Sequence, residues 1–481
     1  MNQIYRAIAI LAIATALALF FYGLRINSYA IAILGIAPAL ALAVQLYLGQ
    51  ANAYCNRGLA QDRRGNYHRA IEEYNQAIRL NPDLALAYSN RAATRLALND
   101  NQGALEDCNQ AIRLNPDLAL AYSNRAAVRL ALNDNQGALE DSNQAIRLNP
   151  KLALAYSNRA AARLGLGDNQ GVLEDCNQAI RVNPKLALAY SHRGAARLVF
   201  GDHQEALEDC NQAIRLNPKL AHAHHSRSLV RLALGDNQGA LADGNQAIRL
   251  NPNLANAYHG RSLVRLVLDD NQGTLEDCNQ AIRLNPNLAD AYLIRSLARF
   301  ILNDNQGSLE DCNQAIRLNP NLADAYFRRG AIRSYTNDIQ GAIEDFTQII
   351  CLNPNADNYY NRGVLHYQLG NNQEAIEDLS QVLQLNPNVV AAYYNRGNAR
   401  YDLGDEQGAF EDYNQAQSIE RNSDIDPDDE HGYYGRALAR SRLGDNQGAM
   451  EDLQKSAKLC SDHRNTATHQ QVQETMRKLQ Q

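Results

Sequence analysis

The chain has little of several residue types. It contains no Trp, only three Met, and only six Lys among its 46 basic residues. Its net charge of −6 over 481 residues is too close to balance to indicate binding to nucleic acid or to an acidic membrane surface. The chain also lacks an HExxH, P-loop, nucleophile-elbow or CxxC motif. We therefore expect neither an enzyme nor a bound cofactor.

Proline is scarce as well, yet its spacing is the most informative feature of the sequence. Ten of the 12 prolines follow an Asn, and nine of these ten recur every 34 residues. They are Pro82, Pro116, Pro150, Pro184, Pro218, Pro252, Pro286, Pro320 and Pro354, with Pro387 following after 33 residues. A period of this length predicts a solenoid of stacked units, each of which buries its apolar face against its neighbours.

One unit, residues 85–118, indicates how each repeat folds. Apolar or small residues recur at helical spacing over residues 85–98 and again over 104–114. Between these stretches, Asn99, Asp100 and Asn101 are typical of a turn followed by a helix N-cap. The next Asn-Pro pair ends the second stretch, because the residue before a proline resists the helical conformation. Each repeat is therefore predicted to be a pair of antiparallel helices.

This pattern resembles the tetratricopeptide repeat (TPR) family. With Ala85 as position 1, the family pattern has an aromatic residue at position 4, small residues at 8, 20 and 27, and proline at 32. These positions hold Tyr88, Ala92, Ala104, Ala111 and Pro116. The same set recurs in repeats that we place at starts 51, 85, 119, 153, 187, 221, 255, 289, 323, 356, 390 and 430.

The resemblance implies an all-α fold, a right-handed α-solenoid of about 12 helix-turn-helix repeats over residues 51–463. It also implies a non-enzymatic scaffold that binds protein or peptide partners. Residues 464–481 are predicted to form a helix that caps the open end of the solenoid, since Val472, Met476 and Leu479 share one helical face.

Two charged positions recur without exception. Position 7 is Arg in all twelve predicted repeats, and position 23 is acidic in all twelve, from Glu73 in the first to Asp452 in the last. Helices that fold back near position 15 bring positions 7 and 23 level, so each Arg is expected to pair with the acid of its own repeat. We interpret this ladder as structural, because a buried charge requires a partner. An anion-binding strip is the alternative.

Five of the eight cysteines share one repeat position: Cys108, Cys176, Cys210, Cys278 and Cys312. Equivalent positions in stacked helix pairs lie about 10 Å apart, whereas a disulfide requires Cα atoms within about 7 Å. These cysteines are therefore predicted to be small buried hydrophobic residues.

Two charge-free apolar runs precede the repeats, at residues 7–24 and 28–48. A helix needs about 20 apolar residues to cross a bilayer, so residues 1–50 are predicted to form a two-helix transmembrane hairpin that anchors the chain. Arg6 and three Arg that follow the hairpin outnumber Arg25 in its loop, which predicts an integral membrane protein with its repeats facing the cytoplasm. A secretory signal over the first run is the alternative, and it would fit an exported envelope assembly factor.

The predicted partner site lies late in the array. Residues 85–118 and 119–152 differ at only three positions, so these early repeats offer no distinct contacts. In the family, positions 2, 5, 9, 12 and 13 of each first helix line the concave face. Aromatic residues with polar groups are common anchors of binding surfaces, although a core role for some of them is the alternative. The predicted partner-binding residues are Phe327, Tyr335, Tyr360, Tyr367, Tyr394, Tyr401 and Tyr434.

Three other patterns were considered as sites. TPR domains that clamp a terminal carboxylate use Lys at position 5 and Asn at 9, a pair that does not recur here. The spacing of Asp424, Asp426 and Asp428 suggests a calcium loop, but the required Gly and Glu are missing. A histidine cluster lies mid-array, where adjacent repeats are too far apart for one metal ion; a regulator that binds a small ligand or metal there is the alternative. Its members are His192, His203, His222, His224, His225 and His259.

Overall fold

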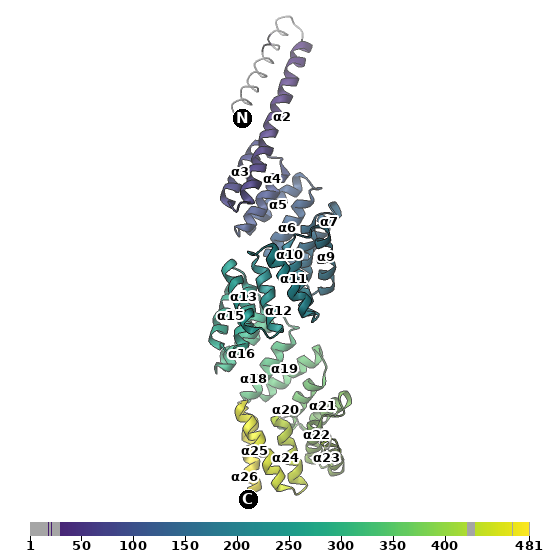
Figure 1. Ribbon diagram of the computed structural model, residues 1–481. Coiled ribbons are helices and arrows are strands. Elements are labelled where there is room, and N and C mark those ends of the chain that lie inside the picture. Colours follow the sequence, from purple (N-terminus) through teal and green to yellow (C-terminus); the bar gives the residue numbers. More distant parts are fainter. Residues whose placement is uncertain (1–17, 19–20, 22–28, 421–428, 464, 481) are drawn as a thin grey trace. The chain divides into compact units, whose positions relative to one another are not determined.

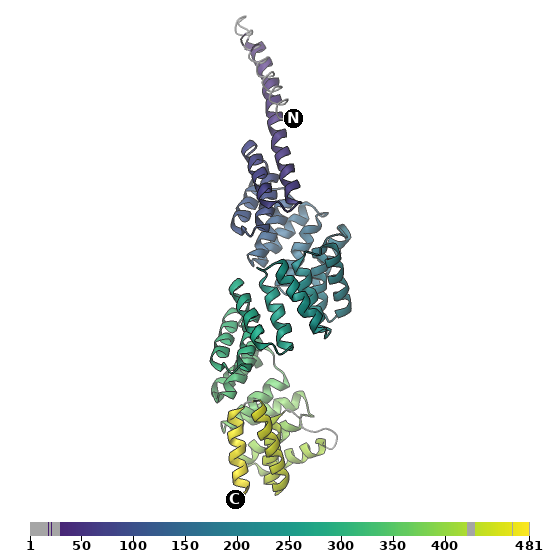
Figure 2. The same ribbon diagram turned by 60° about the vertical axis from the view of Figure 1, so that its left-hand side comes forward.

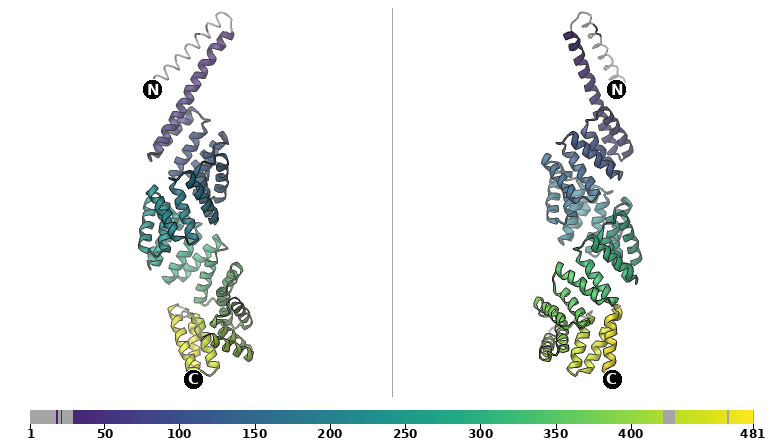
Figure 3. Two further views of the ribbon diagram at one scale, coloured as in Figure 1. Left: turned by 45° about the vertical axis from the view of Figure 1, so that its right-hand side comes forward. Right: turned by 180° about the vertical axis from the view of Figure 1, so that it is seen from behind.

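The computed structural model describes residues 18, 21, 29–420, 429–463 and 465–480, and the regular elements in these residues are α-helices (Figure 1). The chain divides into two compact units, residues 1–251 and 252–481. Within each unit the helices stack in antiparallel pairs, as the views in Figures 2 and 3 also show. The predicted all-α solenoid of helix pairs is therefore confirmed.

In the first unit, each repeat contributes two helices. The first helices are α2 (Tyr29–Asp62), α4 (Ala85–Ala97), α6 (Ala119–Ala131), α8 (Ala153–Gly165), α10 (Ala187–Val199) and α12 (Ala221–Ala233). The second helices are α3 (Tyr67–Leu80), α5 (Asn101–Leu114), α7 (Asn135–Leu148), α9 (Asn169–Val182), α11 (His203–Leu216) and α13 (Asn237–Leu250).

The second unit has the same alternation and ends with one additional helix. Its first helices are α14 (Ala255–Val267), α16 (Ala289–Ile301), α18 (Ala323–Tyr335), α20 (Ala356–Gln368), α22 (Val390–Asp402) and α24 (Glu430–Arg442). Its second helices are α15 (Asn271–Leu284), α17 (Asn305–Leu318), α19 (Ile339–Leu352), α21 (Asn372–Leu385), α23 (Glu406–Glu420) and α25 (Asn446–Asp462), followed by α26 (Thr466–Gln480).

The turn between the two helices of a repeat follows from its sequence. Asn99 has a left-handed backbone with φ of 62°, a conformation that Asn tolerates better than most residues. Gly167 holds the equivalent place in a later repeat, with φ of 80°. The Asp that follows caps the second helix; Asp100 Oδ1, for example, accepts a hydrogen bond of 3.0 Å from the N–H of Gly103.

The cores of the repeats are filled by complementary pairs at positions 8 and 24. Where position 24 is Cys, position 8 can hold a side chain, as Ala92 does beside Cys108, and both are fully buried. Where position 24 is Tyr or Phe, position 8 is glycine: a Cβ added to Gly397 would lie 2.5 Å from the ring of Tyr413. The five cysteines at position 24 are free and buried, as predicted.

The predicted transmembrane hairpin and the integral membrane location are wrong. In the part of the chain that the structure describes, no helix is both long and apolar enough to span a membrane. The first predicted span, residues 7–24, falls almost entirely outside the described residues. The second, residues 28–48, is not an independent helix, because α2 continues without interruption to Asp62. The C-terminal half of α2 carries polar residues and packs against α3, which buries Ala51 and Cys55. A run without charged residues was therefore an insufficient criterion for a transmembrane helix.

The last repeat is attached differently from the others in the second unit. There, across the boundary with the preceding repeat, α16 and α22 pack mainly against a second helix, whereas α24 packs mainly against α22, a first helix. This junction directs α26 towards α18, where the Thr466 hydroxyl donates a 2.8 Å hydrogen bond to the carbonyl oxygen of Tyr335. The apolar face of α26 covers the last repeat, with Val472 fully buried against Ala437 and Leu453.

Candidate functional site

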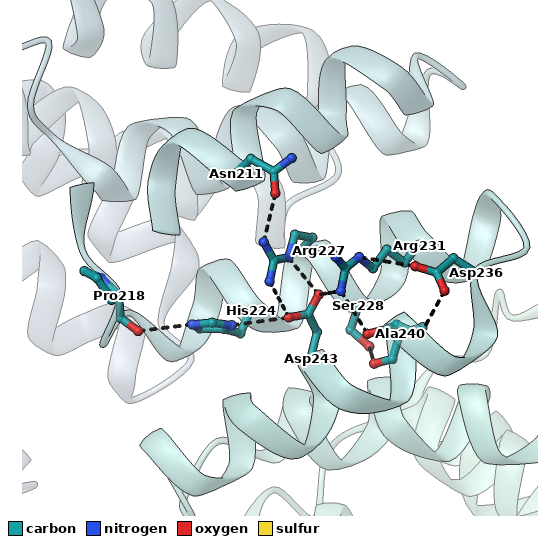
Figure 4. Close-up of polar contacts among 10 residues, drawn as sticks. Asn211, Pro218, His224, Arg227, Ser228, Arg231, Asp236, Ala240 and Asp243 are labelled. Atoms are coloured by element: carbon teal, nitrogen blue, oxygen red, sulfur yellow. Dashed lines mark hydrogen bonds and ion pairs between the residues drawn. The ribbon is translucent and has the colours of Figure 1, made fainter. Parts of the chain in front are cut away.

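A charged network recurs in each repeat, and Figure 4 shows it around Asp243. The Asp243 carboxylate is 4% exposed and accepts two 2.7 Å hydrogen bonds from the guanidinium of Arg227 at position 7. Arg231, at position 11, donates a third bond of 2.8 Å. Burial alone would raise the pKa of Asp243, but His224 and the two guanidinium groups outweigh it, so the net pKa shift is downward.

The predicted pairing of positions 7 and 23 is confirmed in every described repeat, from Arg57 with Glu73 to Arg436 with Asp452. Two further partners were missed. One is the Arg at position 11. The other is an Asn at position 25 of the preceding repeat: Asn211 Oδ1 accepts a 2.8 Å bond from Arg227. Both residue types recur in the sequence and could have been found by extending the position count. Because its guanidinium donors are already engaged, Arg227 has a structural role.

The histidines do not form one cluster. His224 stands where most repeats have Tyr at position 4, and its Nε2 lies 3.1 Å from the carbonyl oxygen of Pro218 (Figure 4). Burial, together with the neighbouring His222, lowers the pKa of His192 to about 4. Within the described residues, no three His, Cys, Asp or Glu side chains are arranged to hold a metal ion. The structure thus gives the metal-binding alternative no support.

A cavity in the second unit lies between α18, α20 and the start of α24. It has a volume of ≈ 460 Å³. Phe327, Ala331 and Tyr335 line it from positions 5, 9 and 13 of α18, and Tyr360 lines it from position 5 of α20. The Phe327 side chain is 44% exposed and meets the buried Phe346 edge to face, with ring centroids 5.8 Å apart. Three of the seven predicted partner-binding residues, Phe327, Tyr335 and Tyr360, therefore share one concavity. We call it the α18–α20 cavity.

Two acidic residues close the α18–α20 cavity from α24. Asp429 Oδ1 caps α24 by accepting a 2.8 Å bond from the Gly432 N–H, and Oδ2 accepts another of 2.8 Å from the Tyr360 hydroxyl. Burial raises the pKa of Asp429. Glu430 pairs with His463 at 3.0 Å and accepts a 3.2 Å bond from Asn465. Burial raises the pKa of Glu430, but histidines 431 and 463 together with Asn465 lower it by more, so the net shift is downward.

The other four predicted residues lie elsewhere. Tyr394 is 1% exposed and stacks on Tyr413, so it has the core role that was the alternative. Tyr401 packs against the same core and has the Arg442 guanidinium 4.5 Å from its ring centroid. Tyr367 and Tyr434 line a second cavity of ≈ 280 Å³ beside α26, and the Tyr434 hydroxyl lies 3.2 Å from the Thr475 hydroxyl. The predicted set is therefore not one continuous surface.

Sequence reasoning missed the acidic residues of the α18–α20 cavity. Asp357 belongs to the concave positions, at position 2 of α20, but only aromatic residues were selected there. Asp429 and Glu430 follow residues 421–428, which lie outside the described residues. The only available signal was the 40-residue spacing between the predicted starts at 390 and 430, since a longer connection permits a different packing of α24.

Sequence comparison identifies the repeat. Models described as TPR repeat or tetratricopeptide repeat match residues 51–84, 193–255, 363–404 and 390–423. The chain is a tetratricopeptide repeat protein. No curated protein sequence matches this TPR protein significantly.

Solved structures of other proteins are similar to this chain. A chain of the APC/C hetero-tetramer Cut9–Hcn1 is similar to this TPR protein with a TM-score of 0.51 and 15% sequence identity, covering 95% of each chain. Yeast Tom70 is 17% identical with a TM-score of 0.35, covering 89% of this chain and 95% of its own. A tetratricopeptide repeat protein from Parabacteroides merdae is 19% identical with a TM-score of 0.38, covering 52% and 99%. The similarity to the Cut9–Hcn1 chain supports the solenoid fold.

Proposed function

We propose that this TPR protein is a scaffold that binds a segment of another protein in the α18–α20 cavity, by contact and without catalysis. One observation carries the proposal: a ≈ 460 Å³ concavity with exposed aromatic surface at the positions where the repeat faces inward. Exposed aromatic side chains in concave sites are frequent binding anchors, because they bury a large area at a small cost in conformational entropy.

The polar groups around the cavity support a binding role over a catalytic one. Asp429 caps a helix and Glu430 holds Asn465, so both carboxylates already have structural partners. The Tyr335 carbonyl is bonded to Thr466, which fixes the edge of the cavity. A site with fixed walls binds without paying for the ordering of its own side chains.

The proposal is tested by filling the cavity. Ala331, which lines it, is replaced by Trp in the full chain, and partner capture is measured by crosslinking through a photoreactive residue at Ser334. Ala331→Trp should abolish the crosslinked partner. The matched control is Ala93→Trp, at the same position 9 of a repeat in the first unit, where the side chain is exposed. Helical content and melting are compared first, and equal capture by both folded variants would place the site elsewhere.

A further inference from the structure

We propose that the α18–α20 cavity recognises a cationic side chain of the partner, a Lys ammonium or an Arg guanidinium on its aliphatic stem. This inference rests on the proposed function and adds the chemistry of the ligand. It follows from three properties of the cavity wall: the sign of its charges, the aromatic faces beside them, and the apolar surface deeper in.

The charged residues that line the cavity are all acidic. Asp357 comes from α20, and Asp429 and Glu430 come from the start of α24. Among the described residues that line it there is no Lys or Arg, and His431 is the one titratable base. In the ladder, by contrast, each acidic residue at position 23 is paired with an Arg, so this wall has an excess of negative charge.

One of these carboxylates is available to a ligand. Asp357 is exposed, and it makes no hydrogen bond or ion pair with any described residue. Asp429, in contrast, is already bonded to Tyr360 and to Gly432. A cation in the cavity would therefore meet Asp357 directly and would also be attracted by Asp429 and Glu430.

The remaining walls suit the stem of a long basic side chain. Phe327, Tyr335 and Tyr360 offer aromatic faces, which attract cations through the negative potential of the ring. Leu365, Val382 and Val389 provide aliphatic surface within the same cavity. Lys and Arg have this division, with an apolar stem and a charged end. A carboxylate ligand would meet repulsion, and a purely apolar one would leave Asp357 without a counter-charge.

The test compares probes with and without a cationic end group. N-acetyl-lysine N-methylamide and N-acetyl-arginine N-methylamide are compared with uncharged N-acetyl-norleucine N-methylamide, by saturation-transfer NMR titration of the full chain. The part of the binding that Ala331→Trp removes defines the cavity. Both cationic probes should bind there severalfold more tightly than the norleucine probe. Asp357→Asn should reduce that preference severalfold, and Asp290→Asn, at the same repeat position on α16 and also exposed, should leave it unchanged.

The outcomes separate this inference from the proposed function. Three results would each overturn the cationic specificity. They are binding of the norleucine probe as tight as that of the cationic probes, equal effects of the two Asn variants, and cationic binding that Ala331→Trp does not reduce. In those cases, loss of partner capture in Ala331→Trp would still support the scaffold function. Conversely, cation-selective binding in the cavity with undiminished partner capture would overturn the proposed function and leave a site for a free organic cation.

Discussion

Removing one carboxylate of the Arg–Asp ladder should unfold its surroundings. Asp209 is 4% exposed and accepts bonds of 2.8 and 2.6 Å from Arg193 and one of 2.6 Å from Arg197. The substitution Asp209→Ala removes the carboxylate acceptor of both guanidinium groups, which are partly buried. Breaking a buried ion pair in this way costs about 3–5 kcal/mol. The Arg193 and Arg197 side chains keep 18% and 27% exposure, so water can partly replace the lost acceptor and the lower end, about 3 kcal/mol, is expected.

The assay must be local, because repeat arrays unfold in segments and a single melting temperature averages over them. Native-state hydrogen exchange of α10 and α11 measures the free energy of opening at this repeat. Asp209→Ala should lower it by about 3 kcal/mol, whereas Glu208→Ala, the exposed neighbour, should change it by less than about 0.5 kcal/mol. The double variant Arg193→Leu with Asp209→Leu should recover part of the loss, since it removes both charges of the 16-residue pair and leaves only Arg197, which is 27% exposed, without its carboxylate partner. Unchanged protection in Asp209→Ala would refute a structural ladder.

Three further predictions concern the core, the histidines and the C-terminal cap. Gly397→Ala should destabilise its repeat by about 1–3 kcal/mol, because the added methyl group overpacks against Tyr413, and Tyr413→Cys in the same chain should relieve the clash. Urea unfolding followed by circular dichroism measures both effects. An unchanged midpoint for Gly397→Ala would contradict the packing argument. His192 binds fewer protons in the folded state, since folding lowers its pKa from 6.5 to about 4. Its contribution to stability should therefore be intact above pH 6.5 and decline as the pH falls towards 4. The proton resonances of His192 should titrate near pH 4, and titration near 6.5 would contradict burial of the side chain. Val472→Asp places a charge at a fully buried position and should abolish exchange protection in α24–α26 while leaving α4–α11 protected; retained protection in α24–α26 would show that α26 is dispensable.

The sequence predicted contacts that repeat within one unit. Arg193 and Asp209 stand 16 residues apart, and the same spacing recurs in other repeats, so antiparallel pairing of the helices was enough to bring them together. The residue types at positions 8 and 24 also recur with the repeat, so they too can be read from the sequence. Contacts of this kind depend on local periodicity, which a single sequence records directly.

The α18–α20 cavity could not be predicted in the same way, because it depends on contacts that no period describes. Tyr360 reaches Asp429 across 69 residues, and Thr466 reaches Tyr335 across 131. Both contacts follow from the packing of α24 on α22, which the repeat pattern does not contain. The aromatic pattern therefore identified Phe327, Tyr335 and Tyr360 but also selected Tyr394, whose ring closes the core.

The failure of the hairpin prediction has a related cause. Absence of charge was counted over residues 28–48 as if the run were an independent element. In the structure α2 extends from Tyr29 to Asp62, and its later turns belong to the first repeat, so a window of hydropathy did not coincide with a unit of structure.

In the near-identical repeats, the bond from a ladder Arg to an Asn of the preceding repeat determines how the array can change in length. Arg125 reaches Asn109, and Arg159 reaches Asn143, so each repeat carries a donor at one boundary and an acceptor at the other. Any repeat with both residues can follow any other, and the core pair at positions 8 and 24 travels inside the unit. Adding or removing one 34-residue copy among the near-identical repeats therefore leaves an Arg–Asn bond at each new boundary, without a compensating substitution. The length of this part of the chain is free to vary in whole repeats, whereas the repeats around α18, α20 and α24 are tied to their places by contacts that no other repeat supplies.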